Sequence, residues 1–129
     1  MIVANGAAAR LLAAAIALPL AVCAGDPILP DIPKIVSELR IAPYEQHEEC
    51  AVLVAGDRLD YYFEAKAPVT FNIRYRAGGM VLSPVARENS LGHSGIFVPP
   101  LAQRYCLWWE AGPQGSLVDY RIRLLRAIR

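Results

Sequence analysis

Apolar and polar side chains alternate over much of the chain from Lys34 onward, and a period of two is the pattern of a β-strand that buries one face. The clearest runs cover residues 59–65, 69–75 and 118–124, where apolar side chains occupy every second position. No convincing helical pattern interrupts these runs. The alternation therefore predicts an all-β chain.

Shorter apolar runs predict five more strands, at residues 35–41, 50–54, 80–83, 95–98 and 105–110. Residue pairs that favour tight turns separate the runs. The expected turns are Gly56-Asp57, Ala67-Pro68, Gly78-Gly79, Pro99-Pro100 and Gly112-Pro113. About eight short strands joined in this way predict an antiparallel β-sandwich.

The first 24 residues have the organisation of a signal peptide. Residues 1–10 carry one basic side chain and no acid, residues 11–18 are apolar, and Pro19 ends that run. The apolar run is far shorter than the roughly 20 residues that a transmembrane helix needs. We therefore expect an exported protein, periplasmic or secreted, without a permanent membrane span.

Two processing sites fit the end of this leader. Cleavage after Ala24 puts Val22 and Ala24 where signal peptidase favours small residues, and this is the interpretation that we prefer. The alternative is a bacterial lipobox, in which Cys23 would be lipidated and would anchor the protein to a membrane. Val22 stands where a lipobox usually has Gly, Ala or Ser.

Removal of residues 1–24 leaves 105 residues, which suits a single domain. Residues 25–33 contain three prolines and form a Pro-rich lead-in, so the predicted domain covers residues 34–129. The 13 basic residues fall to 12 when Arg10 is lost, against 12 acidic ones. Without an excess of positive charge there is no electrostatic basis for nucleic-acid binding, and we expect none.

Cys50 and Cys106 remain after either cleavage. In a small exported β-domain two such cysteines are most simply a disulfide. The bond would close a loop of 56 residues, and the chain-entropy relation gives an upper-end stabilisation of about 4 kcal/mol for a loop of this size. A covalent link is useful here because a domain this small has a marginal core.

The order of motifs along residues 34–126 resembles the Golgi-dynamics (GOLD) domain family. The motifs are Cys50, Gly56-Asp57, Leu59-Asp60-Tyr61-Tyr62-Phe63, Val69-Thr70-Phe71-Asn72-Ile73, Gly95-Ile96-Phe97 with Pro99, Tyr105-Cys106 and Trp109-Glu110. The resemblance implies a GOLD-like β-sandwich that recognises proteins or lipids, with its cysteine pair bridged. The chain departs from the family at Gln103-Arg104, where Gly is usual, and at Ala111, where Asn is usual.

Catalytic and metal-binding patterns are weak. Gly92-His93-Ser94-Gly95 lacks the last glycine and the strand-to-helix context of a nucleophile elbow. His47, Glu49 and His93 could supply metal ligands together with nearby Glu45 and Glu48, but they do not have the spacing of a metal signature. We favour a solvated acidic segment and expect no catalytic residue, metal or cofactor.

Arginines on two predicted strands could form a binding stripe. Arg74 and Arg76 share one strand face through their i, i+2 spacing, as do Arg121 and Arg123. If the two strands adjoin, these four side chains would bind a planar anion or carboxylate. A merely solubilising outer face is the alternative that we favour.

Adjacent Trp108 and Trp109 must point to opposite faces of their strand. One is expected in the core, while the other is either buried in a second layer or exposed as a contact anchor. Because Cys106 and Leu107 suggest a central strand, burial of both is slightly favoured. Trp108 nonetheless joins the arginines as a candidate binding residue.

These features favour a non-catalytic recognition or adaptor module of the bacterial envelope that binds a protein or a lipid. Two alternatives stay open. One is a metal-assisted hydrolase that uses His47, Glu49 and His93, and the other is a small-ligand or lipid carrier, which would need a cavity that so small a chain can barely enclose.

The N-terminus provides the first testable prediction. Intact-mass measurement of protein recovered from its native compartment should give a species that begins at Gly25, because residues 19–24 suit ordinary signal peptidase better than Val22 suits a lipobox. A mass that starts at Cys23 and includes acyl chains would instead establish a lipoprotein.

Overall fold

The computed structural model describes residues 26–128, all of them outside helices. The predictions for the leader and for Cys23 lie outside this range. The strands are β1 (Lys34–Ile41), β2 (Gln46–Leu53), β3 (Arg58–Ala77), β4 (Met80–Phe97), β5 (Gln103–Ala111) and β6 (Ser116–Leu125). Between residues 26 and 128 no helix could span a membrane.

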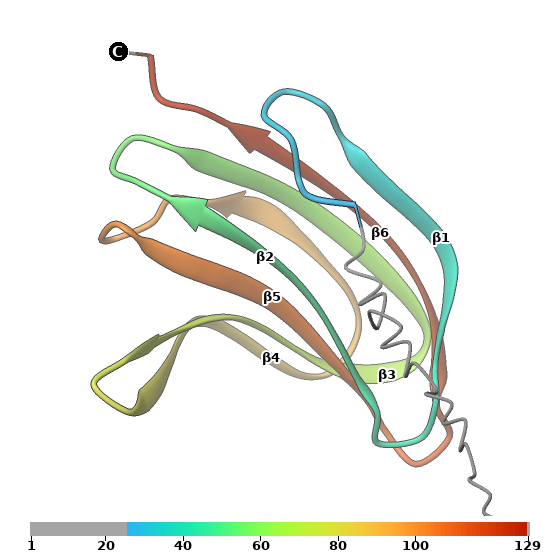
Figure 1. Cartoon of the computed structure of the whole chain (residues 1–129). Helices are drawn as coiled ribbons and strands as arrows, with labels where there is room; N and C mark the ends of the chain where they lie inside the picture. The colour runs from blue at the N-terminus through green and yellow to red at the C-terminus, as the bar shows by residue number, and fades with distance from the viewer. Residues whose placement is uncertain (1–25, 129) are drawn as a thin grey trace, which may run out of the picture.

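All six strands belong to one antiparallel sheet, in the order β1-β6-β3-β5-β2, with β4 paired to β3. The sheet curves into a half-barrel with β1 and β2 as its two end strands (Figure 1). The prediction of an all-β antiparallel fold is confirmed. The prediction of an eight-stranded sandwich is wrong, because neighbouring predicted strands merge.

β3 is one continuous strand that contains the predicted turn Ala67-Pro68. Its first part, to Ala65, pairs with β6, and its second part, from Val69, pairs with β5. Pro68 lies in the gap between the two ladders, and the ladder to β4 is also interrupted between Glu64 and Val69. A proline is tolerated there because no partner strand requires its missing N–H.

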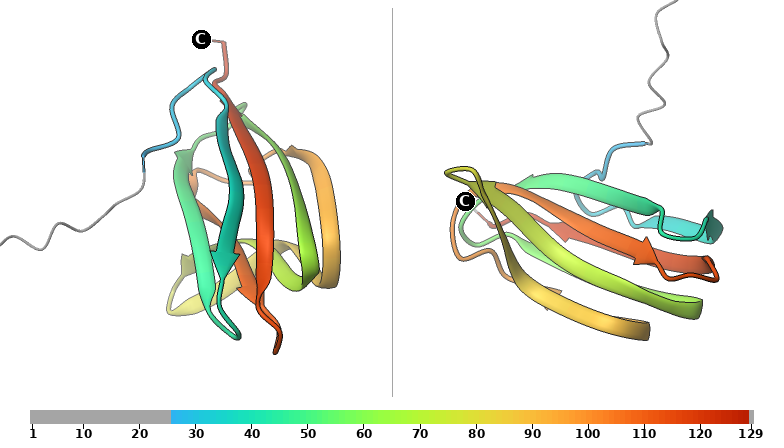
Figure 2. Two further views of the ribbon diagram at one scale, coloured as in Figure 1. Left: turned by 90° about the vertical axis from the view of Figure 1, so that its right-hand side faces the viewer. Right: turned by 90° about the horizontal axis from the view of Figure 1, so that it is seen from below.

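β4 merges the predicted strands 80–83 and 95–98, so that β3 and β4 form one long bent hairpin (Figure 2). Gly78 and Gly79 form its turn, and both have positive φ, 57° and 79°. Two residues with positive φ are what a type I′ hairpin turn requires, which explains why glycine occupies both positions. The prediction of this turn is confirmed.

The inner faces of the two parts of the sheet pack against each other. Along β3 the buried side chains are Leu59, Tyr61, Phe63, Val69, Phe71 and Ile73, as the alternation predicts. Tyr120 of β6 stacks on Trp109 of β5 with ring centroids 4.7 Å apart, and Phe63 and Phe71 also lie 4.7 Å apart. A single aromatic core therefore joins the β6 side of the half-barrel to the β5 side.

The lead-in packs against the domain instead of extending away from it. Ile28 is buried in the core, and Pro30 forms a parallel bridge with Leu124 of β6. The amide of Asp31 donates a hydrogen bond of 2.8 Å to the carbonyl of Leu124. The ordered fold thus begins before the predicted boundary at residue 34.

The Asp57 side chain connects the β2–β3 turn to the segment that follows β6. This side chain is fully buried and accepts hydrogen bonds of 2.9 Å from the amides of Val54 and Ala127, as well as 2.8 Å from Arg126 Nη1. Burial alone would raise the pKa of Asp57, but these hydrogen bonds and the Arg126 charge outweigh it and lower the pKa. The carboxylate therefore stays ionised and holds the two segments together.

We predict that Asp57→Ala lowers the free energy of unfolding by about 2–4 kcal/mol, because buried donors lose their acceptor. Asp60→Ala is the matched control, since Asp60 faces the outer side of β3 and should change stability by about 0.5 kcal/mol or less. Urea denaturation of the three proteins measures the difference. Equal stabilities for both variants would contradict the assigned role of Asp57.

Candidate functional site

The predicted disulfide is confirmed between Cys50 and Cys106. The two residues are directly opposite each other in the ladder of β2 and β5, with their Cα atoms 4.0 Å apart. Their flanking neighbours Glu49, Tyr105 and Leu107 are buried, so the bond lies on the outer face of the half-barrel.

The two tryptophans of β5 lie on opposite faces of the sheet. Trp109 points inward and is 1% exposed, whereas Trp108 lies on the outer face and is half-buried. The guanidinium of Arg74 lies over the Trp108 ring, 3.8 Å from its centroid. The expectation that both tryptophans are buried is wrong for Trp108, because residues 26–128 place no second protein layer on this face and Arg74 partly covers the ring instead.

Beside Trp108 is a shallow pocket of about 190 Å³, which we call the arginine pocket. Its lining residues are Glu48, Arg74, Tyr75, Arg76, Val81, Gln103, Arg104 and Cys106. Among residues 26–128 the ion pairs are Lys34–Glu49 and Arg126–Asp57, so none of these arginines is paired to a carboxylate. Three guanidinium groups and one carboxylate give the pocket a net positive charge.

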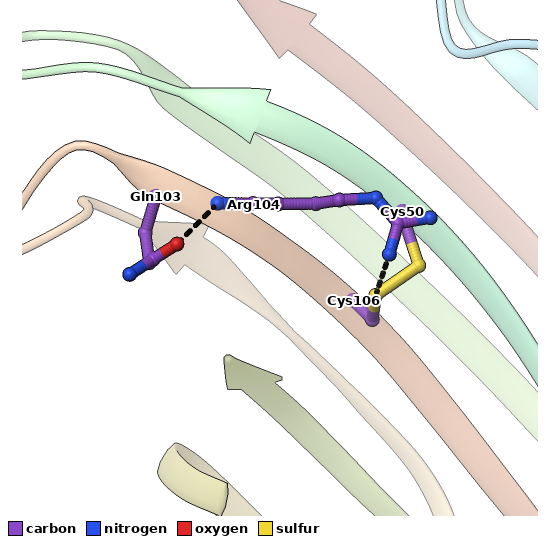
Figure 3. Close-up of a disulfide and its surroundings, with 4 residues drawn as sticks. All are labelled: Cys50, Gln103, Arg104 and Cys106. Atoms are coloured by element: carbon purple, nitrogen blue, oxygen red, sulfur yellow. Dashed lines mark hydrogen bonds between the residues drawn. A yellow bond between two sulfur atoms is a disulfide. The ribbon is translucent and has the colours of Figure 1, made fainter. Parts of the chain in front are cut away.

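Arg104 was not among the predicted binding residues. Its guanidinium Nη1 lies 3.8 Å from Cys106 Sγ, and its backbone N–H donates to the side-chain oxygen of Gln103 (Figure 3). The sequence could have predicted this position. Arg104, Cys106 and Trp108 occupy alternate places on one strand, so their side chains share a face.

The four predicted arginines do not form one stripe. In the ladder of β3 with β6, Arg121 is opposite Tyr62 and Arg123 is opposite Asp60. Arg74 is instead opposite Cys106 of β5. The two strands adjoin, but β3 changes its partner between the two arginine pairs, so of these four arginines only Arg74 and Arg76 line the arginine pocket.

A polar cluster lies inside the half-barrel and links its end strands. Lys34 of β1 forms a 2.7 Å ion pair with Glu49 of β2. The Tyr120 hydroxyl donates a hydrogen bond to Glu49 and lies 2.9 Å from His47 Nε2. Burial, with help from the neighbouring Glu49, raises the pKa of Tyr120 far above its ordinary value. The tyrosine therefore remains a neutral donor.

The candidate metal ligands are not brought together. His47 and Glu49 share the interior cluster, but His93 of β4 packs on Tyr61 and Phe71, with ring centroids 5.6 and 6.4 Å away. In the described part of the chain, the one group with ligand-like spacing is Glu48, Cys50 and Cys106, whose sulfurs are already joined. The segment Gly92-His93-Ser94-Gly95 lies within β4 and forms no nucleophile elbow.

No protein-family model matches the chain, and no curated protein matches it. Among solved structures it is similar to the solution NMR structure of a de novo designed double-stranded β-helix. That likeness has 19% sequence identity and a TM-score of 0.38, and it covers 72% of this chain and 97% of the designed chain. At this TM-score it carries no argument about fold or function.

The interior cluster predicts a pH-dependent stability. Burial lowers the pKa of His47 below 6.5; the Glu49 charge opposes this effect, and the Lys34 charge adds to it. Burial also lowers the pKa of His93. The unfolded chain therefore binds protons at a higher pH than the folded chain, so the free energy of unfolding should fall between about pH 7.5 and 5.5.

Urea denaturation at several pH values measures this slope. His47→Gln should reduce the slope, and removal of both histidines with His93→Gln should nearly abolish it, since a glutamine side chain does not titrate. The assignment would be wrong if His47→Gln left the slope between about pH 7.5 and 5.5 unchanged.

Proposed function

We propose that the chain is a non-catalytic recognition module of the bacterial envelope, GOLD-like in its domain type, that binds an acidic segment of a partner protein in the arginine pocket. The observation that carries the proposal is the set of arginines that surrounds this pocket without carboxylate partners in the described part of the chain. Surface arginines usually solubilise, but these line one pocket, and Arg74 among them is held against the Trp108 ring.

The chemistry of the pocket suits a carboxylate. A guanidinium offers a planar pair of N–H donors that match the two oxygens of a carboxylate. Arg74 is held against the Trp108 ring, 3.8 Å from its centroid, so part of the cost of ordering this long side chain is met before binding. Arginine and tryptophan are also the residue types that most often dominate interface energies.

The size of the pocket favours a protein side chain over a lipid chain. Pockets for drug-sized ligands usually have volumes of roughly 300–1,000 Å³, and the arginine pocket has about 190 Å³. A hydrolase would need free ligands or a free base, whereas His47 and Glu49 already contact Tyr120 and Lys34. We therefore prefer an adaptor to a lipid carrier or a metal-assisted hydrolase.

The disulfide and the leader support an exported location for this module. A Cys50–Cys106 bond suggests an oxidising environment such as the periplasm or the cell exterior. The signal-peptide pattern of residues 1–24 agrees with export. The partner would then be another envelope or secreted protein with an exposed run of Asp or Glu.

A charge-reversal experiment tests the site. In the double variant Arg74→Glu and Arg76→Glu, partner recovery from envelope extracts after crosslinking should fall about tenfold or more, because charge-assisted contacts are lost and repulsion is introduced. The matched control is Arg121→Glu with Arg123→Glu, which makes the same charge change on the β6 part of the sheet and should recover the same partner as the wild type.

Salt dependence and stability complete the test. Recovery by the wild type should fall as salt rises from about 0.05 to 0.5 M, since solvent-adjacent charges are screened. Thermal unfolding should show that both double variants remain folded. Partners that respond equally to the two double variants, or to neither, would contradict recognition by the arginine pocket.

A further inference from the structure

The Cys50–Cys106 bond lies on the outer face of the half-barrel. Both cysteines are half-buried, and Cys106 lines the arginine pocket. The aromatic core, which includes Tyr105 and Trp109, is on the opposite face of the sheet. A small solute in the pocket would therefore lie next to Cys106.

The sheet does not depend on this bond to align β2 with β5. The two strands pair over eight residues, from Gln46 opposite Glu110 to Leu53 opposite Gln103, and the cysteines are one pair within that ladder. Side chains on the inner face of both strands, including Leu53 and Leu107, are buried in the core. None of these contacts runs through the sulfur atoms.

Charges of opposite sign flank the two sulfur atoms. Arg104 Nη1 lies 3.8 Å from Cys106 Sγ (Figure 3). A Glu48 carboxylate oxygen and the two sulfurs all lie within 4.8 Å of one another. Arg74 and Arg76 line the same pocket, so positive groups outnumber the single carboxylate around Cys106. A local excess of positive charge attracts anions and raises their concentration at the site.

We propose that this disulfide is a thiol–disulfide exchange site that reacts preferentially with acidic thiols, that is, small thiols that carry negative charge besides the thiolate. The thiolate attacks Sγ of Cys106, the cysteine that lines the pocket. A bond forms between the incoming sulfur and Cys106 as the Cys50–Cys106 bond breaks, and the electron pair of that bond leaves on Cys50 as a thiolate.

The product is a mixed disulfide on Cys106. Disulfide exchange at this step involves no net oxidation, because one disulfide and one thiolate give another disulfide and another thiolate. Attack by Cys50 on Cys106 Sγ re-forms the protein disulfide and releases the incoming thiol as its thiolate. Attack by a second small thiolate on the incoming sulfur instead forms a small-molecule disulfide and leaves Cys106 as a thiolate. Arg104 draws the incoming anion toward Cys106, while the carboxylate of Glu48 acts against it.

The exchange reaction and the recognition of a partner protein both use the arginine pocket, but they are measured independently. The exchange rate is measured with small thiols and requires no partner. Failure of the exchange experiment would thus leave the recognition proposal intact, and failure of the partner experiment would leave the exchange proposal intact.

The experiment compares two small thiols of different charge on the folded, oxidised protein. The probes are 2-mercaptoethanesulfonate, which carries an additional negative charge, and cysteamine, which carries a positive one. Their rates at equal thiolate concentration are normalised to their rates on an uncharged disulfide, bis(2-hydroxyethyl) disulfide. The normalised ratio is the normalised rate of the sulfonate divided by that of cysteamine. At low salt this ratio should be at least about three, and it should fall towards one as salt rises.

Variants of opposite sign test the two charged neighbours. Arg104→Gln should lower the normalised ratio, and Glu48→Gln should raise it, each by about twofold or more. Arg121→Gln is the matched control on the β6 part of the sheet and should not change it. Alkylation of the first product followed by peptide mapping should locate the mixed disulfide on Cys106 and the alkyl group on Cys50.

Two results would overturn the proposal. The first is a normalised ratio near one that none of the variants changes. The second is a reduction rate that becomes independent of thiol concentration and rises steeply in low urea, which would mean that the bond reacts only after the whole domain unfolds.

Discussion

The fold depends on a change of partner along β3, which pairs first with β6 and then with β5. The Ser116 hydroxyl donates a 2.8 Å hydrogen bond to the carbonyl of Ala67 and accepts one of 3.1 Å from its amide. These two bonds satisfy the backbone groups of Ala67, in the gap where the ladder of β3 with β6 has ended and its ladder with β5 has not yet begun. Because Pro68 offers no N–H, the strand crosses this gap without an orphaned donor there, and one sheet can curve around a single core.

The curvature determines which side chains meet. It brings Tyr120 of β6 onto Trp109 of β5, and it allows Lys34 and Glu49 to join the two end strands. On the outside it separates Arg121 and Arg123 from the disulfide face. The arginine pocket is consequently a compact site on β2, β3 and β5, and this compactness underlies both the recognition and the exchange proposals.

Much of the fold follows from the sequence because a period of two determines which face of each strand is buried, as along Leu59, Tyr61 and Phe63. The disulfide was also predictable. The merger of strands was not, since Ala67-Pro68 is an ordinary turn signal and its tolerance depends on which strands pair beside it. The same long-range pairing places Arg74 over Trp108 on the β5 side of β3 and Arg121 on the β6 side, a separation that the i, i+2 spacing alone does not contain.

Nuclear Overhauser effects across β3 test the central claim most directly, namely that β3 is one strand with two successive partners. The account predicts backbone contacts from Tyr62 to Arg121 and from Asn72 to Trp108 in the same molecule, with no hairpin contacts between residues 59–65 and 69–75. Cross-strand contacts between those two segments, centred on Pro68, would contradict it. They would restore a turn at Ala67-Pro68 and remove Arg74 from the disulfide face.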